Sequence, residues 1–489
     1  CTVLRGVYLQ LFKISKVKKE VNLLMIENDA FKLLLINLFH LNPDDIANIL
    51  CTTFNKMMVL LVTLTDKHQA CPYCGFTAPK IKEYVTKEIT HSALTTQKCI
   101  IKYRARRYKC SCCGKTFYEF NPFVFKSQKI SILTVHNILK DLKDFNETFT
   151  SVARRYHVSP TSVSTIFDNH VDIGRNQLPE IINFDEVYAF KSEKSKYVCV
   201  ILDFKKQIPV DILPNRKKEY LLNYFQKIPL EERKKVKYAC SDMYEVYRDV
   251  VHKVFPNSVC ILDYFHLSQD FHRKMNEVRI KVMKGYKDNK ASDEYYLLKK
   301  FNWLLFKNPE DEDKYGRLFD VERERKYNSH FKSYMNYYDL RKKLLEINND
   351  LTICYSLKLE LVDFYSKSTV DNAKENLENL IRSCIDTNID EMIAFSNNLI
   401  NWKQEIINSF TIVGTEYKVE ADKGQVVVCN KKVNNAIIEN RNKIIKCIKN
   451  NANGYTNWFR FRNRVMYVLD PNATFSLEPR EKQSWMHKT

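Results

Sequence analysis

The sequence lacks any apolar run close to the roughly 20 residues that a membrane-spanning helix requires. Its longest candidates, near residues 31–39 and 57–64, are short enough to be a buried helix or strand. No signal peptide, internal repeat or low-complexity linker is recognisable. Most of the 15 cysteines are isolated in apolar stretches, which is typical of a reduced, cytoplasmic protein rather than a disulfide framework. We therefore expect no membrane partner.

Acidic residues are also in deficit. Asp and Glu number 58 against 78 Lys and Arg, so the formal net charge is +20. This excess suits a polyanionic partner, because phosphate neutralisation supplies most non-specific affinity for nucleic acids. An AT-rich coding sequence would also enrich lysine, so charge alone does not identify the partner. A chain of 489 residues, 45% hydrophobic and 28% charged, is expected to fold into several globular units.

The first residue is Cys1 rather than a methionine, and the stretch before Met25 is basic without continuing into an apolar pattern. We hypothesise that the native protein starts at Met25 and that residues 1–24 are not native. An N-terminal peptide of the native protein that begins before residue 25 would contradict this hypothesis.

Residue patterns divide the chain into six segments, which together predict a multidomain fold of mixed α+β and α/β class. The predicted segments are an N-terminal helical segment (1–66), a cysteine-rich module (67–125), a helical pair (130–178), a strand-rich core (179–269), a charged helical region almost free of Gly and Pro (270–405), and a basic C-terminal part (406–475). Strands are expected within residues 181–190, 197–204, 208–213, 236–241 and 258–263.

Two C-x-x-C pairs, Cys71/Cys74 and Cys110/Cys113, are each followed by glycine. This spacing lets both thiolates of a pair reach one tetrahedral ion, and the glycine permits the tight turn. The residues between the pairs must then form a hairpin. We predict a structural zinc site, with four ordinary cysteines as the alternative and Cys112 as a less symmetric substitute for Cys113. Basic residues around the site would face phosphate: Arg104, Arg106 and Arg107.

Residues 149–170 predict two short helices around a turn at residues 158–160, the pattern of a helix-turn-helix. Ser159 suits the N-cap position and Pro160 suits the first helical position, where its missing N–H costs nothing. Three small hydroxylated residues would then lie on the exposed face that meets base edges: Thr161, Ser162 and Ser164. A plain helical hairpin is the alternative.

Carboxylates interrupt the predicted strands. Asp185 lies inside one strand-like run and Asp242 ends another, while Asp263 ends a third and competes with Asp242 for the same role. A carboxylate in a buried strand is costly unless it is paired or binds metal. Three such acids could hold the two divalent ions of a phosphodiester-cleaving site. Aspartate at a strand end is also common turn chemistry, so each residue alone is ambiguous.

Several dispersed motifs together resemble the ISL-three-type insertion-sequence transposases, a DDE family. They are Phe184-Asp185-Glu186, the run from Val210 to Glu219, Ser241-Asp242-Met243, Phe255-Pro256-Asn257, Asp263-x-x-His266, Met275–Arg279, and the cysteine knuckles with Arg106–Cys110 and Gly114–Phe117. Their order and spacing agree from about residue 30 to about residue 470, so the resemblance covers nearly the whole chain.

The resemblance implies an RNase H-like catalytic core with a large helical insertion, preceded by zinc-binding and helix-turn-helix modules. It assigns Glu439 as the third carboxylate after Asp185 and Asp242, with Glu405 as a weaker rival. The sequence departs from the family pattern here, because Ala436-Ile437 replaces Gly-Pro and Asn440 replaces a Gly. These departures leave open whether this copy is active.

The expected function is transposition of an insertion sequence in bacterial cytoplasm, at the nucleoid. The three carboxylates would hold Mg²⁺ or Mn²⁺, and Asp263 and His266 would assist. Basic residues after Glu439 would mostly face phosphate and clamp double-stranded DNA: Arg441, Lys443, Lys446, Lys449, Arg460, Arg462 and Arg464. The partners would be terminal inverted repeats, target DNA and further copies of the chain. The alternatives are a domesticated or inactive DNA-binding protein and a nuclease without strand transfer.

Overall fold

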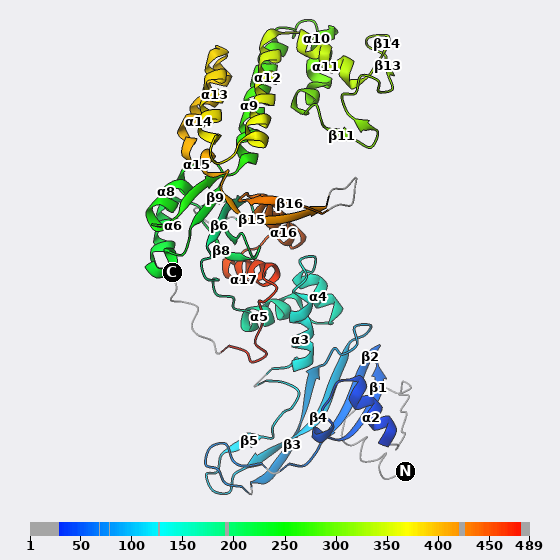
Figure 1. Cartoon of the computed structure of the whole chain (residues 1–489). Coiled ribbons are helices and arrows are strands. Elements are labelled where there is room, and N and C mark those ends of the chain that lie inside the picture. The colour runs from blue at the N-terminus through cyan, green and yellow to red at the C-terminus, as the bar shows by residue number, and fades with distance from the viewer. Residues whose placement is uncertain are drawn as a thin grey trace. The chain divides into compact units, whose positions relative to one another are not determined.

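The computed structural model describes residues 29–480, with gaps at residues 68, 78, 126–127, 191–194 and 420–425 (Figure 1). The hypothetical start at Met25 and the segment before it lie outside the described residues. The chain divides into two compact units, one of Cys1–Gly174 with Cys447–Thr489 and one of Arg175–Lys446. In the described part of the chain, no helix is both long and apolar enough to cross a membrane.

The first unit begins with a twisted sheet and one covering helix. The elements are α2 (Asp29–Leu38), a 3-10 turn (Pro43–Asp45), β1 (Ile46–Phe54), β2 (Met57–Leu64), β3 (Lys80–Thr90), β4 (Cys99–Lys109) and β5 (Thr116–Tyr118). The strand order is β1-β2-β4-β3, with β5 paired to β4. Ile101 and Tyr103 of β4 share one buried cluster with Leu35 and Ile36 of α2. The predicted hairpin between the cysteine pairs is β3–β4, which leads directly into Cys110.

Residues 46–64 correct the expectation of a wholly helical N-terminal segment. They form the antiparallel hairpin β1–β2, and within residues 29–66 α2 is the one α-helix. Asn55 and Lys56 both adopt positive φ, 48° and 61°, at the hairpin turn. A two-residue turn with positive φ at both positions matches the twist of paired strands. Short apolar runs do not separate strand from helix, and the turn decides between them here.

A helical module completes the first unit. Its helices are α3 (Ile132–Asp141), α4 (Phe149–Arg155), α5 (Pro160–His170) and α17 (Trp458–Leu469). Ser159 caps α5 by accepting a hydrogen bond from the Ser162 N–H, and Pro160 occupies the first turn, as predicted. Phe167 and Tyr467 belong to one buried cluster, so the C-terminal helix α17 closes the core of this module.

The second unit contains a five-stranded sheet. Its strands are β6 (Ile181–Val187), β7 (Val198–Asp203), β8 (Pro209–Leu213), β9 (Tyr238–Ser241) and β10 (Val259–Leu262), which confirms the five predicted strands. Their order is β10-β9-β6-β7-β8. Strands β6, β7 and β8 are antiparallel, whereas β9 and β10 run parallel to β6.

Helices cover one face of this sheet. They are α6 (Lys218–Gln226), α7 (Leu230–Arg233) and α8 (Glu245–Val254). Phe184 of β6 packs there against Phe225 and Tyr247. The opposite face carries Ile181 and Cys240, which pack with Val433 and Ile437 near the start of α16 (Ala436–Asn451). Because strand side chains alternate, Asn183 and Asp185 lie on the α16 face.

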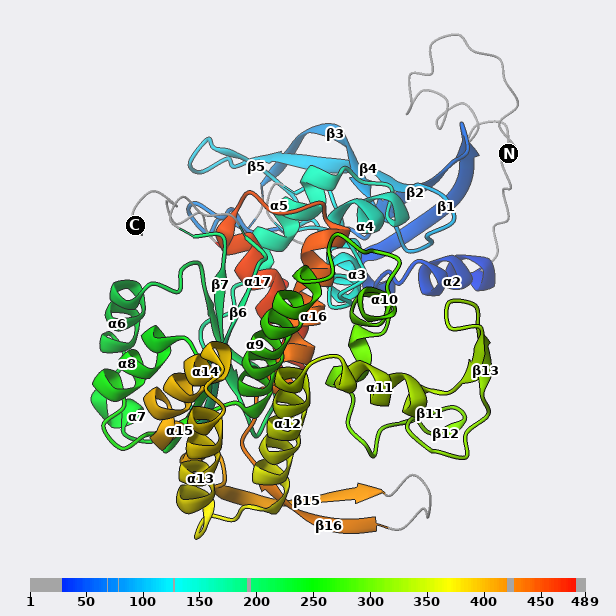
Figure 2. The ribbon, with the colours of Figure 1, turned by 90° about the horizontal axis from the view of Figure 1, so that it is seen from above.

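A large, mainly helical region separates β10 from α16. It comprises α9 (Tyr264–Lys284), α10 (Asp293–Lys300), a 3-10 segment (Asn302–Phe306), β11 (Glu312–Asp313), β12 (Gly316–Arg317), β13 (Lys326–Asn328), β14 (Ser333–Met335), α11 (Tyr337–Glu346), α12 (Asn349–Lys367), α13 (Ala373–Asp386), α14 (Asp390–Asn401) and α15 (Lys403–Asn408). Helices α9, α12, α13 and α14 lie side by side around one core (Figure 2). The hairpin β15 (Ile412–Val419) and β16 (Val426–Lys432) then leads to α16.

Candidate active site and metal centre

Three aspartates gather at one edge of the second unit's sheet. Asp185 lies near the C-terminal end of β6, Asp242 directly follows β9, and Asp263 directly follows β10. These strands are parallel, so their C-terminal ends meet at the same edge. Asp185 and Asp263 are buried, with exposed fractions of 8% and 3%. The sheet therefore concentrates acids where a carboxylate is expensive to bury.

The start of α16 is attached to this edge by hydrogen bonds. Asn183 Nδ2 donates to the Asn434 carbonyl at 2.8 Å and to Asn435 Oδ1 at 2.7 Å. The Asn435 N–H donates to Asp263 Oδ1 at 3.0 Å. These bonds fix where α16 enters the site.

About two turns further along α16, Asn442 Nδ2 donates to Asp185 Oδ2 at 2.8 Å. Glu439 precedes Asn442 by three positions and so lies on the same helix face. Its charge acts on Asp185, which places it at the same site. The structure thereby brings the predicted trio Asp185, Asp242 and Glu439 to one region.

Burial and mutual repulsion alter the titration of these acids. Burial raises the pKa of Asp185 to about 7, and the charges of Asp242, Glu439 and Asp263 add to the increase, whereas His266 opposes it. Burial likewise raises the pKa of Asp242 and of Asp263. Such a cluster disfavours its own negative charge and would gain from a bound cation.

The carboxylates are less tightly gathered than ligands around an ion. Among the described residues, only four cysteines form a group of three or more His, Cys, Asp or Glu whose ligand atoms all lie within 4.8 Å of one another. His266 Nε2 lies 3.9 Å from Asp263 Oδ2. That nitrogen and Asn442 Oδ1 are buried without a hydrogen-bond partner in the described part of the chain. Two polar atoms beside the acids are thus available to bind a ligand.

An open pocket of about 390 Å³ adjoins Asp242. Its lining residues are Arg216, Asp242, Met243, Tyr244, His266, Gln269, Asp270 and Arg273. His266, Gln269 and Arg273 project from successive turns of α9, so one helix face forms part of the wall. The pocket gives solvent and ligands access to the acid cluster.

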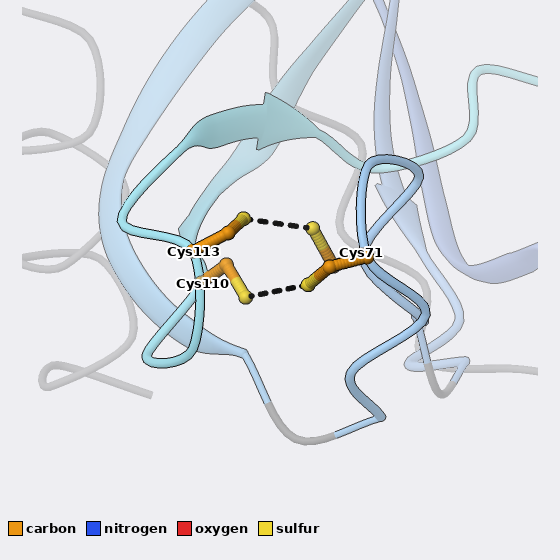
Figure 3. Close-up of side chains that lie close together, drawn as sticks. Cys71, Cys110 and Cys113 are labelled. Atoms are coloured by element: carbon orange, nitrogen blue, oxygen red, sulfur yellow. Dashed lines mark hydrogen bonds between the residues drawn. The ribbon is translucent and has the colours of Figure 1, made fainter.

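Cys71, Cys74, Cys110 and Cys113 form the second candidate centre (Figure 3). The Cys71 and Cys113 sulfurs are 3.7 Å apart, and those of Cys74 and Cys110 are 3.5 Å apart. Tetrahedral zinc with Zn–S bonds of about 2.3 Å would place neighbouring sulfurs about 3.8 Å apart. These thiols can therefore hold such an ion, and Cys112 is exposed outside the group.

The two cysteine pairs have the same local build. The Gly75 N–H donates to the Cys71 carbonyl and the Gly114 N–H donates to the Cys110 carbonyl, at 2.9 Å and 3.0 Å. Both glycines have positive φ, 74° and 71°, which a side chain would strain. This is the reason for glycine after each pair.

Residues 182–421 match a family model described as Transposase, of the DDE and ISL-three type. Over these residues the chain is therefore similar to ISL-three-type transposases. It is similar to the transposase for insertion sequence element IS1001 from Bordetella parapertussis, with 19% identity over 413 residues that cover 84% of this chain and 91% of that protein. The family match includes Asp185 and Asp242 and ends before Glu439.

Two of the three predicted phosphate-facing arginines of the cysteine module bind other parts of the protein. Arg106 donates to the Glu119 carboxylate at 2.7 Å and to the Leu64 carbonyl. Arg107 pairs with Glu83. Arg104 is exposed and stacks over the Tyr84 ring at 4.7 Å. Of the three, Arg104 offers the most accessible charge.

The arginines of α17 also contact the protein. Arg460 donates to Asp168 through both Nε and Nη2, and Arg462 donates to the Ile173 carbonyl. The expectation that the arginines of this tail mostly face phosphate is wrong for Arg464, which is 1% exposed and donates to the Asp144 and Glu147 carbonyls. A DNA role for Arg460 and Arg462 stays a prediction.

On α16, Lys443 and Lys446 are exposed, and Arg441 is half-buried with Nε bonded to the Gln207 carbonyl. On α5, Thr161 is exposed, while Ser162 and Ser164 are half-buried. Their hydroxyls bond locally, to Ser159 Oγ and to the Thr161 carbonyl respectively. Their roles with DNA remain predictions.

Glu405, the rival third carboxylate, is buried on α15. It faces Arg248 and His252, at 3.9 Å and 3.8 Å, rather than the aspartates. Sequence reasoning missed the Asn183–Asn435 bond, the Asn442–Asp185 bond and the pocket position of Arg216. Arg216, Asn435 and Asn442 lie in stretches that match the family pattern, but the pattern assigned none of them a role.

Proposed function

We propose that this protein is a DDE transposase with an RNase H-like catalytic core. In this proposal it binds the terminal inverted repeats of its insertion sequence, cleaves the DNA at their ends and joins those ends to target DNA. The sheet supports the assignment: three antiparallel strands, two parallel strands and the order β10-β9-β6-β7-β8. The observation that carries it is geometric: Asp185 lies on the strand beside the one that Asp242 follows, and it bonds to Asn442, one helical turn from Glu439 on α16.

Asp185, Asp242 and Glu439 would hold divalent cations, Mg²⁺ or Mn²⁺. The donor set fits, because hard cations prefer carboxylate oxygens. The raised pKa of Asp185 and the unpartnered Asn442 Oδ1 indicate a site with spare polar capacity and too much negative charge. When bound, two ions would activate a water molecule and stabilise the leaving oxygen.

The chain's own side chains would prepare this site. Asn442 orients the Asp185 carboxylate through Nδ2, and the Asn435 N–H orients Asp263. In the first step, a water oxygen bonds to phosphorus and the 3′-oxygen of the element end leaves. In the second step, this 3′-hydroxyl attacks a phosphodiester of target DNA and displaces its 3′-oxygen.

The first unit would select the DNA. We propose that Cys71, Cys74, Cys110 and Cys113 hold a structural zinc ion, since four thiolates leave no open ligand position. We further propose that α4 and α5 act as a helix-turn-helix, with the exposed N-terminal turn of α5 at the base edges. Copies of the chain would pair on the two element ends, at DNA of the nucleoid.

The test uses linear DNA that ends in the element's own inverted repeats, incubated with purified protein and Mg²⁺. Wild type is compared with Asp242→Ala and Glu439→Ala. Cleavage at the repeat boundary that disappears in both variants supports the three carboxylates. A target-joined product separates a transposase from a simple nuclease. Binding without cleavage by wild type would contradict the proposed activity and favour a domesticated DNA-binding protein. That alternative is suggested by the residues that depart from the family pattern around Glu439.

A further inference from the structure

Arg216 occupies the wall of the pocket beside Asp242. It lies in the loop between β8 and α6, where Asn215 Oδ1 accepts a hydrogen bond from the Lys217 N–H at 2.8 Å. Asn215 is 6% exposed, so this turn is anchored in the protein rather than projecting from it. The backbone of Arg216 is therefore held close to the acids.

The guanidinium of Arg216 is itself held on three sides. Its central carbon lies 4.6 Å from the ring of Tyr197 and 4.6 Å from the ring of Tyr244. Its Nη1 donates to the carboxylate of Glu186, the residue after Asp185. A guanidinium between two aromatic rings with one fixed ion pair loses little further freedom when it binds a ligand.

Part of this guanidinium is unused. Among the residues that the structure describes, neither Nε nor Nη2 of Arg216 has a hydrogen-bond partner. The side chain is 27% exposed and lines the open pocket. Two donors on one planar group match two oxygens of a phosphate.

The second arginine of the pocket is different. Arg273 is 59% exposed and pairs with two acids of its own helix, Asp270 and Glu277. It is neither stacked nor anchored from another element in the described part of the chain. Arg216 and Arg273 thus each bring one positive charge to the pocket, but, among the described residues, the side chain of Arg216 is held in place by other elements and that of Arg273 is not.

We propose that Arg216 binds a phosphodiester of the substrate DNA in the pocket beside Asp242. This inference rests on the proposed function and names a contact that positions the strand for cleavage. Glu186 and the two tyrosines orient the guanidinium, and Arg216 itself touches the phosphate. The partner is one backbone phosphate near the repeat boundary, so the contact carries no base preference of its own.

The test is a double-perturbation cycle, in which one side chain of the protein and one phosphate of the DNA are changed separately and together. Repeat-end DNA duplexes carry a single neutral methylphosphonate at successive positions around the boundary, and dissociation constants are measured by fluorescence anisotropy without divalent cations. Wild type is compared with Arg216→Gln, Arg216→Lys and, as the matched control, Arg273→Gln. Thermal melting verifies that each variant is folded.

We expect one position where the methylphosphonate weakens wild-type binding about 10-fold, as loss of one charge-assisted bidentate contact should. Arg216→Gln should lose this sensitivity, Arg216→Lys should retain part of it, and Arg273→Gln should keep it. Equal sensitivity of Arg216→Gln and wild type at every position would overturn the inference, as would loss of sensitivity in Arg273→Gln.

Binding and cleavage separate this inference from the proposed function. If wild type fails to cleave but the Arg216-dependent position persists, the cleavage proposal fails and the phosphate contact stands. If wild type cleaves but no position depends on Arg216, the contact is wrong and the function stands. A wild type that does not bind the repeat ends at all would overturn both.

Discussion

The cysteine centre and the carboxylate centre are built in opposite ways. Each cysteine pair is local, with two thiols on one tight turn, and the four ligand atoms already lie within 4.8 Å of one another. The carboxylates come from β6, the ends of β9 and β10, and α16, and they do not converge so closely. The difference indicates that the four thiols are already arranged to hold one ion. The acids, in contrast, would come closer together only when ions and substrate bind.

The two centres also differ in how deeply they are buried. Cys74 and Cys113 are exposed, whereas Cys71 and Cys110 are buried. Asp185 and Asp263 stand on a sheet whose strands are almost wholly buried. Removal of metal should therefore unfold the cysteine module, whereas the carboxylate unit should keep its fold and lose only chemistry.

The largest effect is expected from Asp185→Asn. Single-turnover cleavage should fall by about 10³-fold or more, because metal ions supply several kcal/mol of transition-state stabilisation and about 1.4 kcal/mol is tenfold in rate. Folding should survive. Burial raises the pKa of this carboxyl to about 7, so at pH 8 the folded protein carries its charge at a cost in stability, and a neutral amide should melt no lower.

The control for this variant is Glu405→Gln, which removes the rival carboxylate beside Arg248. It should cleave at a rate close to that of wild type. Cleavage by Asp185→Asn within tenfold of wild type would contradict the assignment of the site.

The second effect is expected from Cys71→Ser. Zinc should fall from about one ion per chain to nearly none, since structural zinc contributes about 10–16 kcal/mol in small modules. Repeat binding should weaken by about 100-fold as the module loses its fold. Zinc is measured by atomic absorption and binding by anisotropy.

Cys112→Ser is the matched control, because Cys112 is exposed and lies between two ligands without being one. It should retain both zinc and DNA binding. A Cys71→Ser protein that keeps its zinc, or a Cys112→Ser protein that loses it, would show that the ligand set is wrong.

A smaller effect is expected from Asn442→Ala, which tests how the carboxylate centre is kept in order. Loss of a hydrogen bond to a charged group costs about 1.5–3 kcal/mol, so cleavage should fall about 10- to 100-fold. Asn440→Ala, an exposed neighbour on α16, should cleave normally. Equal rates for the two variants would mean that the Asn442–Asp185 bond does not position the site.

Local patterns predicted the parts of the molecule that local chemistry determines. The C-x-x-C-Gly turns, the Ser159-Pro160 helix start and the five core strands needed only neighbouring residues. The hairpin β1–β2 was missed because its strands are short apolar runs, which fit helix and strand alike. The positive φ at Asn55 and Lys56 distinguishes them, and the sequence Asn-Lys is a weak signal for it.

Contacts between distant segments could not be predicted. The Asn442–Asp185 bond joins two elements far apart in the chain, and no spacing rule relates them. Arg464 reads as one of several tail arginines, yet the Asp144 and Glu147 carbonyls bury it. A charged residue's sequence context gives its charge, whereas its partner depends on tertiary packing.

The smallest effect is expected from a change of pH, which should shift the stability of the two units in opposite directions. His91 is buried in the first unit, between Ser131 Oγ at 2.9 Å and the Phe39 carbonyl at 2.8 Å. Burial lowers its pKa from the ordinary 6.5, and the nearby His40 also lowers it, whereas the Phe39 bond opposes the shift. The unfolded chain therefore takes up the proton first, and the first unit loses stability as pH falls below 6.5.

Asp185, Asp242 and Asp263 of the second unit have raised pKa values, so their protonation favours its fold and mild acid should stabilise it, against the opposing effect of His272, whose pKa burial lowers. Hydrogen exchange of each unit at about pH 7.5 and about pH 5.5, on either side of the ordinary histidine pKa, should show protection falling in the first unit and rising in the second. His91→Gln should reduce the response of the first unit, in which burial also lowers the pKa of His170, whereas the control His136→Gln should preserve it. If both units lose protection together in acid, the burial of His91 and of the three aspartates does not set the pH response of the units. The cysteine centre and the carboxylate centre would then differ only in their ligands.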